Sequence, residues 1–211
     1  MCSSLPKFAI QTNSITRRKI TLVSKIRVWC PGATYHITAR GNRKEDIFKS
    51  KEDRLMYLSI IEDTLKRYKN SYEIMCYCLM TNHIHLLIKT LDLHPSYFMG
   101  RTNSLYAKYF NNKYEYVGHL FQGRYHSELI TNITQLLVTS QYIHLNPVRA
   151  NIVSKPEEYE WSSYKMYIGW QKEKLVVTKE ILSFFKDRSR ISYREYVEEG
   201  APGARDICQN E

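Results

Sequence analysis

The stretch that decides the fold is IMCYCLMTNHIHLLIKT, residues 74–90. Two apolar runs, Ile74 to Leu79 and His83 to Thr90, are separated only by residues 80–82, which predicts a β-hairpin. Alternate residues of a strand share a face, so His83 and His85 point the same way. Such a pair can form two corners of a metal site, or it can be an exposed polar face without a ligand.

Further elements are predicted on both sides of this hairpin. A first strand spans Thr34 to Arg40 and ends at the turn signal Gly41-Asn42. Residues 51–69 read as an amphipathic helix with a capping box of Ser50 and Asp53. Its expected apolar stripe is Leu55, Leu58, Ile60, Ile61 and Leu65.

Three more elements follow the hairpin. A second helix is expected over Ser96 to Phe110, with Asn111-Asn112-Lys113 as its break. Residues 119–130 read as a bent fourth strand with a kink at Gly123. A third helix over Thr134 to Leu145 is expected to end at Asn146-Pro147, because a residue before proline is pushed out of helical geometry.

The resulting order, β-α-β-β-α-β and then a helix, predicts an α+β chain with a ferredoxin-like core and an antiparallel sheet. Two helices should cover one face of this sheet, and the other face can be left open for a site. Residues 1–24 are expected to be a flexible basic arm, residues 25–150 the main domain, and residues 151–211 a helical C-terminal appendage.

The composition is that of an ordinary globular protein, but the charge is not. Hydrophobic residues make up 43% and charged residues 25%, while 31 Lys and Arg against 21 Asp and Glu give a formal net charge of +10. This excess favours an anionic polymer as partner, although a solvated basic surface is the alternative. The 17 tyrosines could hold unpaired bases by stacking of their aromatic rings. Five scattered cysteines and the lack of a long apolar segment predict reduced thiols in the cytoplasm and no membrane association.

The third predicted helix carries a second chemical signal. Tyr142 and Asn146 are four residues apart and therefore share a helix face, while His144 points away from it. A helical tyrosine is more often a core residue than a nucleophile. Here, however, the residue four positions later is the polar Asn146 at the expected end of the helix, which argues against a core position for Tyr142. Tyr106 is the other candidate nucleophile, and no amide follows it at the same spacing.

The sequence is also compatible with two alternative kinds of site. Cys76 and Cys78 with the two histidines have a spacing that could form a zinc site, unless the strand register makes the cysteines core thiols. His36-Ile37-Thr38 is similar to the His-x-Thr motif of two-histidine phosphoesterases, but His83-Ile84-His85 is not the required second copy.

Four ordered blocks carry a family resemblance. MTNHIHLL, residues 80–87, resembles the metal-binding strand of the single-tyrosine HUH transposases. GATYHITARGN (32–42), FQGRYHS (121–127) and YIHLNPVRA (142–150) are similar to blocks of their REP-associated branch. Together with the less diagnostic WSSY (161–164), they span most of the chain in the right order.

The resemblance implies a metal-dependent enzyme that cuts and rejoins single-stranded DNA, often at the foot of a hairpin. Tyr142 would attack the phosphorus and become a 5′-phosphotyrosine, and residues 25–150 would be the HUH domain. His83, His85 and Asn146 would hold Mg²⁺ or Mn²⁺, with Asn where the family often has Gln. The alternative is a domesticated nucleic-acid-binding module of the same fold that no longer cleaves.

Several polar residues are candidate DNA contacts, each with a solvated surface role as its alternative. They lie after the first strand, on the second helix and around the third: Arg40, Asn42, Arg43, Lys108, Arg124 and Arg149. Both a monomer and a homodimer are compatible with the sequence.

Overall fold

The computed structural model describes residues 29–200, so the predicted arm at 1–24 lies outside the described residues. A four-stranded sheet forms its centre, with the strands β1 (Thr34–Arg40), β2 (Tyr72–Leu79), β3 (His83–Thr90) and β4 (His126–Ile130). Their order is β2-β3-β1-β4, and each neighbouring pair is antiparallel. The α+β class, the hairpin and the β-α-β-β-α-β order are confirmed.

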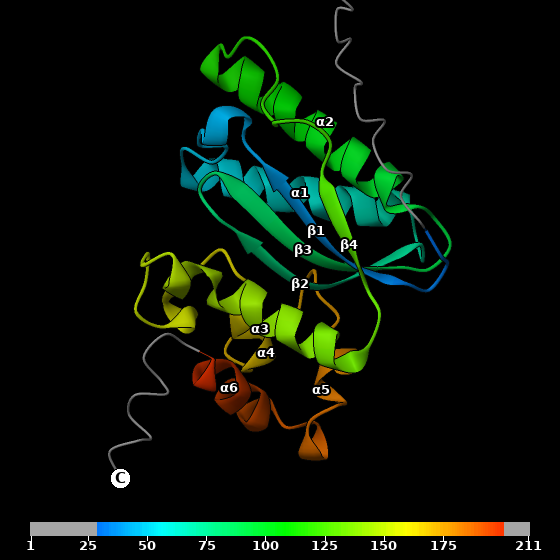
Figure 1. The fold of residues 1–211 in the computed structure, drawn as a ribbon. Helices are drawn as coiled ribbons and strands as arrows, with labels where there is room; N and C mark the ends of the chain where they lie inside the picture. The colour runs from blue at the N-terminus through cyan, green and yellow to red at the C-terminus, as the bar shows by residue number, and fades with distance from the viewer. Residues whose placement is uncertain (1–28, 201–211) are drawn as a thin grey trace, which may run out of the picture.

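Two helices, α1 (Lys51–Arg67) and α2 (Pro95–Tyr114), cover one face of the sheet (Figure 1). Ile37, Leu86 and other strand residues meet them in one apolar core. The capping box at the start of α1 is present as predicted. The predicted stripe is wrong in one position, because Leu55 is 51% exposed and the ring of Tyr57 is buried instead.

Helix α2 runs through residues 111–113, which were expected to break it, and ends at Tyr114. A tertiary contact accounts for the extension. The Lys113 ammonium lies 2.7 Å from a carboxylate oxygen of the fully buried Asp53, and the Tyr114 hydroxyl donates to the other oxygen. Burial alone would raise the pKa of Asp53, but these hydrogen bonds and those from backbone N–H groups lower it to about 2.

This carboxylate gives a prediction for stability. We expect Asp53→Asn to lose at least about 2 kcal/mol of unfolding free energy at pH 7, because the helix cap and the charged hydrogen bonds are both weakened. Asp63→Asn on the same helix is the control: its partner is Arg101, its side chain is 62% exposed, and it should cost less than about 1 kcal/mol.

The pH dependence of the Asp53 contribution has a definite sign. The folded pKa of about 2 lies below the unfolded value of about 3.9, so the stabilisation is complete above roughly pH 4. It is lost as the pH falls through about 2. Urea unfolding at several pH values should therefore show the gap between wild type and Asp53→Asn closing in acid, and a constant gap would contradict the assignment.

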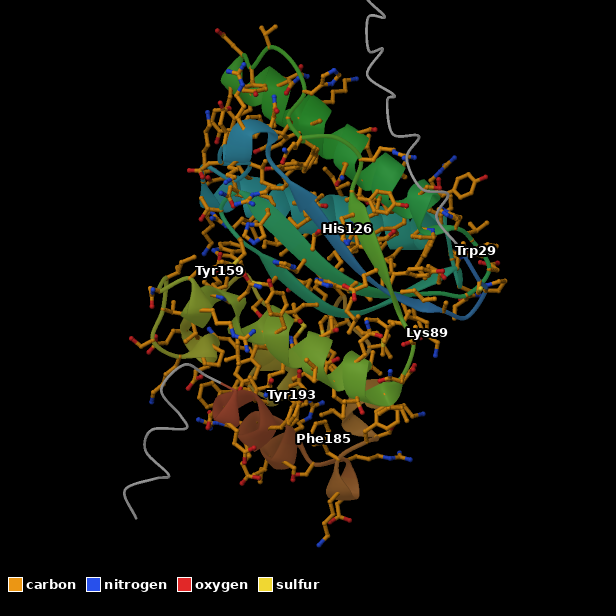
Figure 2. All side chains as sticks on the ribbon, in the orientation of Figure 1. Trp29, Lys89, His126, Tyr159, Phe185 and Tyr193 are labelled. Carbon is orange, nitrogen blue, oxygen red and sulfur yellow. The ribbon has the colours of Figure 1, made fainter. Side chains whose placement is uncertain are left out.

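The second face of the sheet, which could have been left open for a site, is covered over its β2–β3 half. Helix α3 (Ile133–Arg149) lies over it, followed by α4 (Tyr164–Tyr167), α5 (Lys179–Leu182) and α6 (Arg190–Glu199) (Figure 1). Their side chains form a second apolar core with strand residues such as Cys76 and Leu87. The described part of the predicted appendage, which includes Tyr193 and Phe185 in Figure 2, thus completes a core.

Two predicted boundaries also differ. Helix α3 continues through Pro147, because proline removes only its own N–H and the next turn still forms, with Ala150 N donating to the Asn146 carbonyl. The fourth strand is shorter than predicted: Gly41 and Phe121 form an isolated bridge, and regular pairing begins only at His126.

Three short 3₁₀ segments complete the secondary structure of the described residues: η1 (Asn42–Lys44), η2 (Pro156–Glu158) and η3 (Lys186–Arg188). Between residues 29 and 200, no helix combines the length and the apolar character needed to cross a membrane.

Candidate active site

Three histidines gather on the sheet face that carries α3. His83 and His85 lie on β3, and the antiparallel register pairs Thr38 of β1 with His85. His36 is two residues before Thr38 and therefore shares its face. Its Nε2 atom lies 3.0 Å from Nδ1 of His85, and the two rings are stacked with centroids 5.2 Å apart. The prediction that the two β3 histidines share a face is met, and His36 joins them.

His85 has one ring nitrogen without a partner. Its side chain is buried, its Nδ1 faces His36, and its Nε2 has no hydrogen-bond partner. Buried polar atoms are normally paired, so this imidazole nitrogen has a lone pair available to a ligand. Burial first, and then the charges of His83 and His36, lower the pKa of His85 to about 3. The ring is therefore neutral at pH 7 and can donate a lone pair.

His83 is held between two amides. Its Nδ1 lies 2.6 Å from Oδ1 of Asn82, and the Asn146 side chain is also within hydrogen-bonding reach of the ring. Burial and the nearby Arg40 lower the pKa of His83, while the hydrogen bond with Asn146 opposes the shift. The site thus contains two neutral imidazoles and an amide oxygen, the three groups that the sequence singled out as ligands.

Tyr142 reaches this cluster from α3 of the same chain. Its ring centroid lies 5.5 Å from that of His85 and 6.1 Å from that of His36, both in edge-to-face geometry. The Arg149 guanidinium lies 5.4 Å from the centroid of the Tyr142 ring. The six residues after it, 143–148, are all buried, but Tyr142 itself is 38% exposed, so it is no core residue and a substrate can reach it.

A cavity of about 370 Å³ opens beside the phenol. Residues from β1, β4 and α3 line it: His36, Glu128, Val138, Thr139, Gln141, Tyr142 and Arg149. Burial lowers the pKa of His36, against the opposing charge of Glu128. The cavity combines the phenol with a cation, a carboxylate and polar side chains.

The predicted DNA contacts are only partly brought together. Arg40 is paired with His83 across β1 and β3, and Arg149 lies over the Tyr142 ring. Asn42 and Arg43 belong to η1, directly after β1. Arg124 is exposed in the irregular segment before β4. Lys108 is exposed on α2, which covers the opposite face of the sheet, so it does not belong to this site.

The alternative zinc site with Cys76 and Cys78 does not form. The register pairs Cys78 with His85 and Cys76 with Leu87, and both thiols are buried in the second core, where burial raises their pKa values. Over residues 29–200, no group of three or more His, Cys, Asp and Glu side chains could hold a metal ion. A metal here would need the Asn146 amide as a ligand beside the two imidazoles.

Tyr106, the other candidate nucleophile, and His144 have structural roles. Tyr106 is fully buried on α2 and donates to the Ile47 carbonyl at 2.5 Å. His144 points away from Tyr142 as predicted, with its nitrogens 2.7 Å from the Tyr193 hydroxyl and 2.9 Å from Ser163 Oγ. Neither side chain is available for chemistry.

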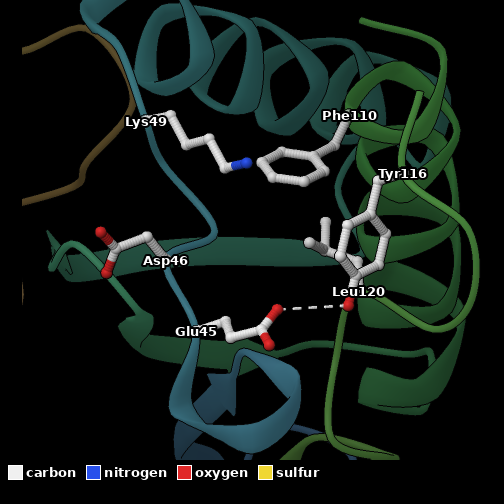
Figure 3. A pocket seen from close by; sticks show the side chains of 6 residues that line it. All are labelled: Glu45, Asp46, Lys49, Phe110, Tyr116 and Leu120. Atoms are coloured by element: carbon white, nitrogen blue, oxygen red, sulfur yellow. Dashed lines mark hydrogen bonds between the residues drawn. The ribbon is translucent and has the colours of Figure 1, made fainter. Parts of the chain in front are cut away.

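A second cavity, of about 410 Å³, lies between the segment after η1 and the end of α2 (Figure 3). It is lined by Glu45, Asp46, Lys49, Phe110, Tyr116 and Leu120. The Tyr116 hydroxyl donates to Glu45 across it, and the Lys49 ammonium points at the Phe110 ring (Figure 3). It contains none of the predicted site residues.

Comparison with known proteins decides the family. A family model described as "Transposase IS200 like" matches residues 30–146, more than half of the chain and the whole span from β1 to Asn146. The chain belongs to the IS200-like transposase family. This transposase is therefore an enzyme that acts on DNA, and its family is generally metal-dependent. No curated protein sequence gave a significant match.

A solved transposase structure shares the fold of this chain. A REP-associated tyrosine transposase bound to a REP hairpin matches with a TM-score of 0.57 and 19% identity, over 76% of this chain and 93% of that one. A protein assigned as a transposase from Deinococcus radiodurans R1 matches with a TM-score of 0.40 and 18% identity, over 57% of this chain and 95% of that one. A tRNA(His) guanylyltransferase from Saccharomyces cerevisiae matches with a TM-score of 0.40 and 13% identity, over 81% of this chain and 78% of that one.

Sequence reasoning missed two residues of the site, Asn82 and Glu128. Asparagine is common in turns, so the presence of Asn82 just before β3 did not predict its contact with His83. Glu128 reaches the site only because β4 pairs with β1, where it lies opposite His36. That pairing follows from the strand order, which the local pattern of residues 126–130 does not reveal.

Proposed function

We propose that this transposase cuts and rejoins single-stranded DNA through a 5′-phosphotyrosine on Tyr142, acting on DNA that forms a hairpin. The observation that carries the proposal is the position of the phenol ring, 5.5 Å from the His85 ring and 6.1 Å from the His36 ring between centroids. One chain supplies both the tyrosine and the histidines, so the proposed reaction needs no residue from a second subunit.

The covalent step is an exchange of one phosphate ester for another. The Tyr142 oxygen forms a bond to phosphorus, the bond from phosphorus to the 3′ oxygen breaks, and the phenol loses its proton while the 3′ oxygen gains one. Since the phosphotyrosine keeps the ester energy, a 3′-OH from another strand can reverse the step. Joining therefore requires no nucleotide cofactor.

The residues fit a divalent metal ion, for which we propose His83, His85 and Asn146 as ligands and Mg²⁺ or Mn²⁺ as the metal. The buried Nε2 of His85 lacks any other partner, and Asn146 is hydrogen-bonded to His83. Two imidazoles and an amide leave open positions, and no thiolate competes for a softer metal. When bound, such an ion polarises a phosphate oxygen.

Arg149 supports the same reaction from the side of the helix. Its guanidinium covers the Tyr142 ring at 5.4 Å and lines the cavity beside it. We propose that it orients the phenol and contacts the phosphate, while Arg40, Asn42, Arg43 and Arg124 hold the flanking strand.

A hairpin is the substrate that the comparison suggests, because the REP-associated transposase was solved with a REP hairpin. The net charge of +10 supports contact with phosphates. We expect the affinity for single-stranded DNA to fall with salt, with a logarithmic slope of about −0.7 for each phosphate that is neutralised. Fluorescence anisotropy over a range of NaCl concentrations measures the slope, and a value near zero would contradict the charge argument.

The test of the function is a covalent adduct. Labelled hairpin DNA with single-stranded flanks, incubated with the protein and Mn²⁺, should give a band on a denaturing gel that combines protein and DNA. Binding without any adduct would instead indicate a DNA-binding module that has lost cleavage.

A further inference from the structure

Asn82, the last residue of the β2–β3 turn, connects the histidine cluster to the basic loop η1. Its amide nitrogen Nδ2 donates to the backbone carbonyl of Lys44 at 3.0 Å. Its carbonyl oxygen Oδ1 lies 2.6 Å from Nδ1 of His83. One side chain therefore contacts a candidate metal ligand and the loop that follows β1.

These two contacts determine which way the amide points. The carbonyl of Lys44 can only accept a hydrogen bond, so the NH₂ group of Asn82 must face it. Oδ1 then faces His83 and can only accept, which requires a proton on Nδ1 of the neutral imidazole. The lone pair of His83 is then left on Nε2, and the side chain of Asn146, the other proposed ligand, is the second amide within hydrogen-bonding reach of the ring. The reverse orientation would set two acceptor oxygens against each other.

The carbonyl of Lys44 is held firmly enough to impose this orientation. Backbone bonds join the two segments: Gly41 N donates to the Asn82 carbonyl at 2.9 Å, and Ile47 N donates to the Thr81 carbonyl at 3.0 Å. The loop is also closely packed, because a Cβ at position 41 would lie 2.1 Å from the carbonyl oxygen of Glu45. A glycine is required there, and the loop has little room to move away from Asn82.

We propose that Asn82 is a positioning residue that holds His83 as its Nδ1–H tautomer and so presents Nε2 as the metal-binding atom. The metal-binding half of this statement rests on the proposed function, whereas the tautomer does not. His85 has the same arrangement, with Nδ1 facing His36 and Nε2 without a partner. A hydrogen bond from the remote nitrogen fixes the ring and makes the other nitrogen a stronger ligand.

The tautomer can be measured without metal. Long-range ¹H–¹⁵N spectra of ¹⁵N-histidine-labelled protein, at a pH where the ring is neutral, distinguish a protonated nitrogen from a bare one, and the loss of one signal in His83→Ala assigns it. Wild type should show the proton on Nδ1. Asn82→Asp keeps an acceptor oxygen and should retain this form, while Asn82→Leu should shift His83 towards the Nε2–H form. A proton on Nε2 in wild type, or no change in Asn82→Leu, would overturn the proposal.

Mn²⁺ affinity tests the consequence. We expect Asn82→Leu to weaken Mn²⁺ binding about 10- to 100-fold, and Asn82→Asp to stay within a few-fold of wild type, as followed by electron paramagnetic resonance of the free ion. Asn111→Leu is the matched control, because its amide also donates to a loop carbonyl, that of Gly118, at the far end of α2. Equal affinities in wild type and Asn82→Leu would contradict the positioning role.

His83→Ala separates the two levels of failure. If His83→Ala abolishes Mn²⁺ binding and Asn82→Leu does not change it, only the role of Asn82 is wrong. If His83→Ala leaves the affinity unchanged, the proposed metal site is wrong, and the tautomer measured by NMR still decides what Asn82 does. Thermal unfolding of each variant, compared with Asn111→Leu, identifies any general loss of structure.

Discussion

Tyr142→Phe should abolish the covalent protein–DNA adduct and reduce cleavage of hairpin DNA by at least about 10³-fold, because the attacking oxygen is removed. Folding should not suffer, since the Tyr142 side chain is 38% exposed. DNA affinity should stay within a few-fold of wild type because the ring and its contact with Arg149 remain. Denaturing gels measure the adduct, and fluorescence anisotropy measures binding.

Two other tyrosines provide controls for this experiment. Tyr97→Phe alters a ring that is 57% exposed on α2, away from the histidines, and should leave the adduct intact. Tyr106→Phe removes the hydroxyl that the sequence left open as a second nucleophile and that donates to the Ile47 carbonyl. It should lower stability and still permit the adduct. An adduct that survives in Tyr142→Phe and disappears in Tyr106→Phe would reverse the assignment.

The sequence predicted the chemically important part of this fold because that part depends on local patterns. Strand alternation fixed the common face of His83 and His85, and helical spacing fixed the pairing of Tyr142 with Asn146. The motifs then supplied the family. That the two pairs meet in space could be expected only from the resemblance, since their elements are about sixty residues apart in the sequence.

What the sequence could not predict depends on tertiary contacts. Residues 111–113 look like a helix break, but the buried carboxylate of Asp53 binds Lys113 and extends α2 beyond them. The short polar strand β4 becomes part of the site only by pairing with β1. The role of Asn82 depends on the position of the Lys44 carbonyl, which no residue pattern encodes.

His83→Ala should reduce cleavage by roughly 10²- to 10³-fold, the factor that corresponds to losing several kcal/mol of metal-ion assistance. Hairpin binding measured in the presence of EDTA should change little, because the phosphate contacts proposed for the arginines do not involve this ring. The result separates a chemical role of His83 from a structural one, since a structural histidine would affect binding and cleavage together.

His119→Ala is the control for the histidine substitution, because this side chain is exposed in the segment after α2 and is no part of the cluster. It should match wild type in both assays. Its comparison with His83→Ala also tests the geometry of the cluster as a whole. If His83→Ala cleaves as fast as His119→Ala in Mn²⁺, the unpaired nitrogen of His85 and the amide of Asn146 do not belong to one metal site. Tyr142 must then be activated by the neighbouring side chains alone.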